Sequence, residues 1–141
     1  MSDLTRFLDA QFSTWPAALA ELKEGRKTTH WMWFIFPQLK SLGRSATAQH
    51  FGIEDLSEAR DYLAHPVLGE RLTEAARALL AHQGQTAEAI LGPVDALKLR
   101  SCATLFREAG GGPEFQAILD VFYGGEACPL TLAELAPRRG A

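Results

Sequence analysis

The fold class of this chain is decided by residues 29–38, which read Thr29-His30-Trp31-Met32-Trp33-Phe34-Ile35-Phe36-Pro37-Gln38. By composition, the aromatic run in this stretch resembles a β-strand. A single strand needs a sheet to join, and the rest of the sequence offers no convincing second strand. We therefore interpret the run as a buried helical or irregular segment that Pro37 interrupts.

The segments around this run show helical periodicity. The clearest stripe is formed by Leu68, Leu72, Ala75, Ala76 and Leu79. Further helices are predicted over residues 4–12, 15–25, 55–64, 86–91, 95–109 and 113–123, with a last capped turn at 131–134. The sequence thus predicts an all-α fold without a sheet, with about six to eight short helices.

Turn and cap residues set the predicted helix ends. Thr14 is expected to cap the helix over residues 15–25, with Pro16 in its first turn and Gly25 at its end. Asp55 and Glu58 form a predicted capping box. One domain is expected over residues 1–141, with a frayed tail from about residue 137.

Charge and composition exclude several classes of function. The net charge of −3 argues against binding to DNA or to an anionic membrane, which needs a basic face. No stretch approaches the ~20 apolar residues of a membrane span. The chain start lacks the features of a signal peptide, so we expect a cytoplasmic protein.

Two cysteines, Cys102 and Cys128, lack the spacing of a metal site or a disulfide framework. Cys102 lies within a helical pattern and is interpreted as a small buried residue rather than a nucleophile. No pair of histidines has the HxxxH spacing of zinc ligands. We therefore expect no metal and no cofactor.

One lysine departs from the pattern of its helix. Lys98 falls at the edge of the apolar arc that contains Leu99 and Leu105, although lysine is rarely buried without a partner. Either its stem covers apolar surface while its ammonium reaches water, or it binds a ligand. Ser101 lies on a neighbouring flank of the helix and could add a hydroxyl.

Other candidates surround the aromatic run. Gln38 carries an amide that needs partners, and the loop at Arg44 and Ser45 could present donors to a phosphate. His30 and His65 are as readily explained by structural hydrogen bonds or helix ends as by ligand binding. The candidate ligand-binding residues are His30, Trp31, Trp33, Gln38, Arg44, Ser45, His65, Lys98 and Ser101. No catalytic residue is assigned.

Several of these motifs together resemble the domain-of-unknown-function family 1810. They are residues 30–38, 43–45, 62–69, 98–101, 104–106 and 122–125, so the resemblance extends from about residue 4 to 135. It implies a small bacterial-type helical domain of uncharacterised function. Such proteins are often labelled calpastatin, but this chain has the composition of a folded domain rather than of a disordered inhibitor.

Three functions are compatible with these residues, and the choice between enzyme and binder stays open. The first is binding of a small anionic, nucleotide-like ligand, with Trp31 or Trp33 against the base and Arg44 and Lys98 on phosphate. In the second, the tryptophan-rich segment is exposed and binds a protein partner. In the third, the aromatic residues only form the core.

Overall fold

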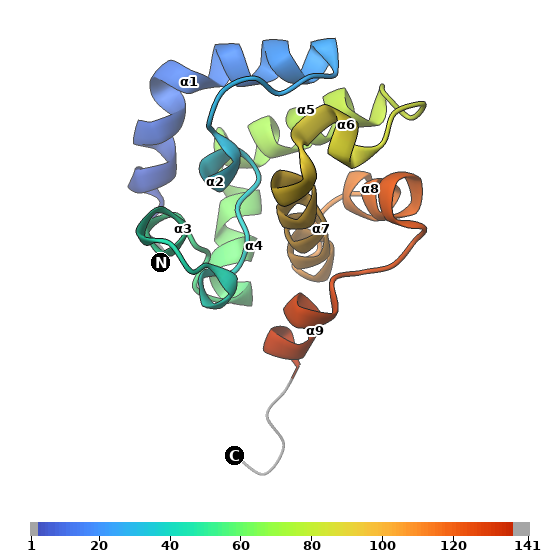
Figure 1. The fold of residues 1–141 in the computed structure, drawn as a ribbon. Coiled ribbons are helices and arrows are strands. Elements are labelled where there is room, and N and C mark those ends of the chain that lie inside the picture. Colours follow the sequence, from blue (N-terminus) through green and yellow to red (C-terminus); the bar gives the residue numbers. More distant parts are fainter. Residues whose placement is uncertain (1–2, 137–141) are drawn as a thin grey trace.

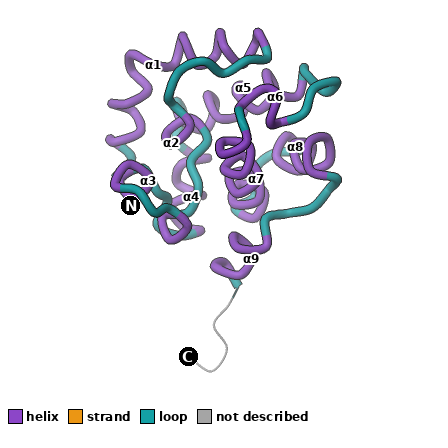
Figure 2. The backbone as a smooth tube through the Cα atoms, in the orientation of Figure 1, coloured by secondary structure: helices purple, strands orange, loops and turns teal. Residues whose placement is uncertain are grey.

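The computed structural model describes residues 3–136, and this part of the chain contains nine α-helices, one 3₁₀ helix and no strand (Figures 1 and 2). The elements are α1 (Thr5–Glu24), α2 (Met32–Ile35), η1 (Lys40–Leu42), α3 (Ala46–His50), α4 (Leu56–Ala64), α5 (Leu68–Leu80), α6 (Ala87–Leu91), α7 (Pro93–Glu108), α8 (Glu114–Tyr123) and α9 (Pro129–Leu135). The predicted all-α class is confirmed. The tail from about residue 137 lies outside the described residues. None of the described helices is both long and apolar enough to cross a membrane.

Helix α1 is one element where the sequence predicted two. It runs through Pro16 without ending, and Figure 1 shows it bent along its length. A proline inside a helix lacks the N–H for one helical hydrogen bond and bends the axis. Residues on both sides of it, among them Phe7 and Leu22, are buried in one core, and this common burial explains why the helix continues. The predicted N-cap at Thr14 is therefore wrong, whereas Gly25 ends the helix in the left-handed conformation (φ 75°), as expected.

The aromatic run forms the short helix α2 and an extended lead-out, and nearly all of it is buried. Beyond Pro37, a single parallel bridge joins Leu39 to Ile53. Its hydrogen bonds run from Lys40 N to Ile53 O (2.8 Å) and from Ile53 N to Gln38 O (2.9 Å). The bridge does not extend into a sheet within residues 3–136, which agrees with the interpretation of this run as non-strand core.

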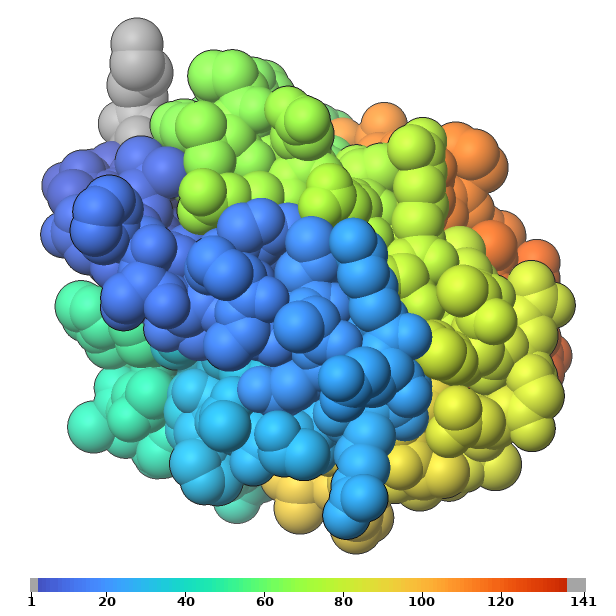
Figure 3. Space-filling model, turned by 90° about the horizontal axis from the view of Figure 1, so that it is seen from above, coloured from blue at the N-terminus to red at the C-terminus, as the bar shows by residue number. Residues whose placement is uncertain are grey.

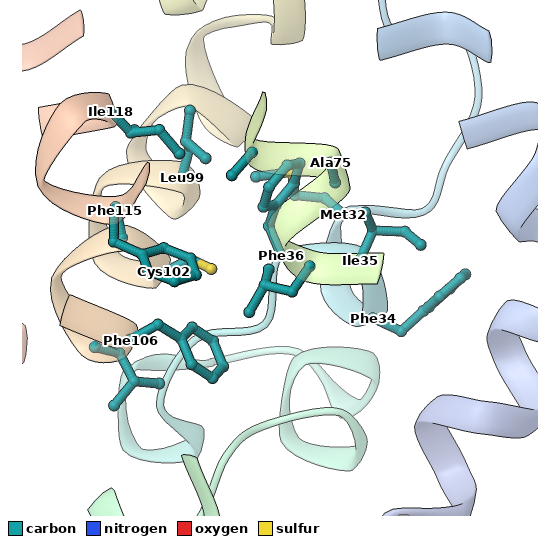
Figure 4. Close-up of a cluster of buried hydrophobic side chains, with 14 of the residues drawn as sticks. Met32, Phe34, Ile35, Phe36, Ala75, Leu99, Cys102, Phe106, Phe115 and Ile118 are labelled. Atoms are coloured by element: carbon teal, nitrogen blue, oxygen red, sulfur yellow. The ribbon is translucent and has the colours of Figure 1, made fainter. Parts of the chain in front are cut away.

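Helix α7 lies at the centre of the fold and packs against α4, α6, α8 and α9 (Figure 1). Leu99, Cys102 and Phe106 of α7 are buried, and Figure 4 shows them facing side chains of α2 and α8. Cys102 is a fully buried part of this core, and burial raises the pKa of its thiol. Both observations fit the predicted role as a small core residue.

Beyond α3, two of the predicted helix caps are confirmed and one is wrong. Asp55 accepts a hydrogen bond from Glu58 N at the start of α4, and Thr86 accepts one from Ala89 N at the start of α6. The N-cap of the last helix lies three residues earlier than predicted. Cys128 is its N-cap residue and Pro129 its first residue, so Thr131 lies inside α9 rather than capping it.

Candidate functional site

The chain leaves α1 at Gly25 and crosses to the junction of α6 and α7 before it enters α2. Lys27 N donates to Ile90 O at 2.8 Å, which attaches this crossing to the end of α6. The buried carboxylate of Glu21 fixes the next residues. It accepts hydrogen bonds from Thr28 N (2.7 Å), from Thr29 N (2.9 Å) and Oγ1 (2.6 Å), and from Trp31 Nε1 (3.0 Å).

These hydrogen bonds decide the charge state of Glu21. Burial alone raises the pKa of a carboxyl group, because it penalises the charged form. Here the donors on Thr29, Thr28 and Trp31 outweigh burial and lower the pKa of Glu21 to about 2. Glu21 is therefore an ionised anchor for the start of the aromatic run, and all of its contacts are structural.

A second carboxylate, Asp95, lies in the first turn of α7 and faces two lysines. Its Oδ2 is 2.9 Å from Lys27 Nζ, and its Oδ1 is 3.7 Å from Lys98 Nζ. The Lys27 side chain is only 8% exposed, whereas that of Lys98 is 23% exposed. The ion pair of Lys27 with Asp95 is thus close and largely buried, whereas that of Lys98 is longer and more exposed.

Each lysine also lies over a tryptophan ring. Lys27 Nζ is 5.0 Å from the ring centroid of Trp31, and Lys98 Nζ is 5.1 Å from that of Trp33. Both distances fall in the range of cation–π attraction. The two lysine–tryptophan pairs share Asp95, so the start of α7 and the aromatic run form one connected charged and aromatic cluster.

Beside Lys98 and Trp33 is a small hollow between α2, α3 and α7. It is lined by Met32, Trp33, Phe36, Gln38, Ala48, Phe51, Gly52 and Lys98. Its free volume of about 10 Å³ is roughly what one water molecule needs. Gln38 lines this hollow, and its side-chain amide has no hydrogen-bonding partner among residues 3–136. The hollow therefore offers one ammonium group, one free amide and an aromatic wall.

The structure brings together three of the predicted site residues, Trp33, Gln38 and Lys98. Trp31 does not join them, because it is 0% exposed and its indole N–H is used by Glu21. Of the two tryptophans proposed to contact a ligand, Trp33 is the one that is partly exposed. The burial of Trp31 also argues against the whole run acting as an exposed protein-binding segment.

The other candidates occupy different places. His30 and Arg44 are exposed, and neither side chain has a hydrogen bond or ion pair within the described chain. Ser45 caps α3 by accepting from Ala48 N, and His65 Nδ1 accepts from Val67 N and Leu68 N at the start of α5.

Ser101 lies on the side of α7 that faces α9. Its Oγ is 3.1 Å from Thr131 Oγ1 and 3.4 Å from Cys128 Sγ. Ser101 is buried in this contact, so its hydroxyl joins two helices. It does not line the hollow beside Trp33.

Three residues of the cluster were not among the predicted site residues: Glu21, Lys27 and Asp95. Glu21 follows Ala18 by three positions and precedes Leu22, so its place on the apolar face was visible in the sequence. Asp95 is the first residue of the predicted helix over residues 95–109, a position at which a solvated carboxylate is common. Only the packing of residues 26–31 against α7 shows that it pairs with Lys27.

Within residues 3–136, no group of three or more histidine, cysteine or acidic side chains is arranged to hold a metal ion.

Comparison with known proteins gives a family and a structural relative. A family described as "Protein of unknown function (DUF1810)" matches residues 1–135. The crystal structure of the conserved hypothetical protein Rv1873 from Mycobacterium tuberculosis superposes with a TM-score of 0.94 at 45% sequence identity. The match covers 96% of this chain and 98% of that one. No curated protein matches the chain.

Proposed function

The chain belongs to this family of proteins of unknown function, and we propose that it binds a small anionic ligand at the hollow beside Trp33, Gln38 and Lys98. The observation that carries the proposal is the loose ion pair of Lys98 with Asp95. Its ammonium lies over Trp33 beside the free amide of Gln38, and its link to Asp95 is long, at 3.7 Å. An incoming anion can therefore pair with Lys98 without breaking a close ion pair.

The groups at the hollow favour a particular ligand chemistry. An ammonium suits a phosphate or carboxylate, and a carboxamide can both donate to and accept from a polar ring or hydroxyl. The ring of Trp33 offers an apolar face for stacking. A nucleotide-like anion combines these features.

The size of the hollow limits how such a ligand binds. A space of about 10 Å³ does not admit a nucleotide ring. In our proposal the ring lies on the accessible surface of Trp33, and the side chains of Trp33 and Lys98 move apart as it binds. Partly exposed side chains, such as those of Trp33 and Lys98, change rotamer readily.

The local charge supports an anion despite the acidic chain. Lys27 and Lys98 contribute two positive charges, which balance the negative charges of Asp95 and of the ionised Glu21. Arg26 is exposed next to Lys27 in the sequence and adds a third positive charge. Such local excess charge raises the encounter rate with anions at low ionic strength.

A thermal-shift screen against nucleotides, NAD, ADP-ribose and sugar phosphates tests the proposal. A ligand at about 100 times its Kd adds about 2.7 kcal/mol of stability, which corresponds to a rise in Tm of roughly 5–10 °C. We expect Lys98→Met and Gln38→Leu to abolish the shift. Lys23→Met, an exposed lysine of α1, serves as the matched control and should leave the shift intact.

Two results would contradict the proposal: no shift with any compound, or an equal shift in the wild type and in Lys98→Met. Arg44→Ala and His30→Ala, measured in the same screen, establish whether these exposed side chains reach the ligand.

We propose in addition that the protein is cytoplasmic. Cys102 and Cys128 are free thiols in the structure, which is the usual state of cysteines in a reducing compartment.

A further inference from the structure

A second surface, independent of the hollow beside Trp33, lies between the first half of α1 and the start of α5. It is an open groove of about 420 Å³ lined by Leu8, Asp9, Phe12, Val67 and Arg71. Figure 3 shows the dark-blue first half of α1 directly against the green segment that begins α5. We refer to these five residues as the α1–α5 groove.

The apolar part of the groove is unusually exposed. The side chain of Phe12 is 87% exposed, although the preceding residue of the same helix, Gln11, is buried. Val67 is 38% exposed, and Leu8 is only partly buried. A phenylalanine in water loses the free energy that burial of its ring would supply, so clustered exposure of this kind is typical of an interaction surface.

The charged part of the groove consists of one carboxylate and one guanidinium that do not pair with each other. Asp9 is exposed and has no ion pair within residues 3–136. Arg71 is pre-positioned: its guanidinium lies 5.5 Å from the ring centroid of Trp15, and its Nη1 donates to Gln11 Oε1 at 3.3 Å. Its other N–H groups have no acceptor among the described residues.

One unpaired negative and one unpaired positive group in the same apolar groove make that groove complementary to itself. In a two-fold dimer, residue i of one copy meets residue j of the other, and j meets i. Such an arrangement pairs Asp9 of each copy with Arg71 of the other and covers both Phe12 rings. We propose that the occupant of the α1–α5 groove is a second copy of this chain, forming a two-fold symmetric dimer.

Sedimentation equilibrium of the full chain, from low-micromolar to about 1 mM concentration, tests the dimer. We expect reversible dimerisation of the wild type. Phe12→Ser should weaken it by about tenfold or more, because it removes the most exposed apolar side chain of the interface. Leu97→Ser is the matched control, since Leu97 is 69% exposed on α7 and lies outside the groove.

Charge reversal gives a sharper test of the symmetry. Asp9→Arg alone places the introduced guanidinium of each copy against Arg71 of the other, and Arg71→Glu alone places two carboxylates together, so each variant should be monomeric. An equimolar mixture of the two should form a heterodimer in which opposite charges meet again. Far-ultraviolet circular dichroism verifies that each variant is folded. If Arg71→Glu does not fold, the dimerisation of Asp9→Arg and of Phe12→Ser is compared with that of Leu97→Ser instead.

A wild type that stays monomeric over the whole concentration range overturns the proposal. So does a Phe12→Ser variant that dimerises as strongly as Leu97→Ser, because the dimer would then use another surface. With folded single variants, a mixture that stays monomeric excludes the reciprocal pairing of Asp9 with Arg71.

Discussion

The indole Nε1 of Trp31 donates a 3.0 Å hydrogen bond to Oε1 of Glu21, and this bond joins the end of α1 to the start of the aromatic run. The same carboxylate holds the backbone of Thr28 and Thr29. One ionised side chain thus orients the crossing segment that carries Lys27 to Asp95 and places Trp33 beside Lys98. The geometry of the candidate site therefore depends on a residue that does not line it.

Replacing Glu21 by Gln should lower the free energy of unfolding by about 2–3 kcal/mol near pH 7. The amide keeps the shape but loses the charge, and its NH₂ group opposes donors on Thr29 or Trp31. The pKa of Glu21 is about 2 in the folded chain against 4.5 for a free glutamate. Its contribution is therefore complete above about pH 4.5 and is lost as the pH falls toward about 2.

Urea unfolding of the wild type and of Glu21→Gln, at about pH 7 and again at about pH 2.5, measures this contribution. The gap between the two proteins should shrink markedly at the lower pH. Glu24→Gln, an exposed residue of the same helix, should match the wild type at both values. A gap of equal size at both pH values would contradict the role of the ionised carboxylate.

The two tryptophans of the run should respond differently to substitution by phenylalanine. Trp31→Phe removes a buried N–H donor and leaves Glu21 with one partner fewer, so we expect a loss of about 2–3 kcal/mol. Trp33 is only partly buried, and Trp33→Phe should cost about 1 kcal/mol or less. Equilibrium unfolding gives both values, and acrylamide quenching of a Trp15→Phe/Trp33→Phe protein, in which Trp31 is the remaining tryptophan, should show a protected indole. Equal destabilisation by the two changes would contradict this account.

The all-α class was predictable because the helical stripes and most of the caps are local signals. The joining of two predicted helices into α1 was not, because the sequence shows a proline and a capping residue but not the common core that keeps both halves together. The start of α9 was not predictable either, because it also depends on packing between distant helices. Thr131 reads as a cap, yet its hydroxyl is buried and meets Ser101 on a helix 30 residues away.

The candidate site was predictable only in part, for a related physical reason. Trp33, Gln38 and Lys98 stand out by residue type, and they do meet at one hollow. Trp31 has the same residue type, but it is fully buried against Glu21, whereas Trp33 is partly exposed beside Lys98. No periodicity within four residues distinguishes the two. Asp95 becomes informative only through Lys27, which lies far earlier in the chain.

Two glycines are required by close backbone contacts. A Cβ at Gly69 would lie 2.1 Å from the carbonyl oxygen of Leu63, and one at Gly52 would lie 2.3 Å from Lys40 Cα. Backbone atoms cannot move aside as a flexible side chain can, so Gly69→Ala and Gly52→Ala should each lower the stability by about 1–3 kcal/mol. At Gly84 a Cβ meets open space, and Gly84→Ala should stay within about 0.5 kcal/mol of the wild type. Thermal unfolding of the three variants checks this, and a Gly69→Ala protein as stable as Gly84→Ala would refute the contact.

The two thiols should differ strongly in reactivity. Cys102 is fully buried, and burial raises the pKa of its thiol, so it should react only when the chain unfolds. Cys128 is partly exposed at the start of α9. Burial tends to raise the pKa of its thiol, but hydrogen bonds from Ser101, from Thr131 and from the backbone of Thr131 and Leu130 outweigh it and lower the pKa. More of Cys128 is therefore thiolate at a given pH than for a free cysteine.

Alkylation by iodoacetamide, followed by peptide mass spectrometry across a pH series, distinguishes the two cysteines. Cys128 should be modified first, with its rate rising at a lower pH than that of a free thiol. Ser101→Ala removes one donor to the thiolate, so it should raise the pKa of Cys128 and move the rate profile to higher pH. A profile unchanged by Ser101→Ala would show that this hydroxyl does not stabilise the thiolate. Labelling of Cys102 ahead of Cys128 would contradict the packing of α7 itself.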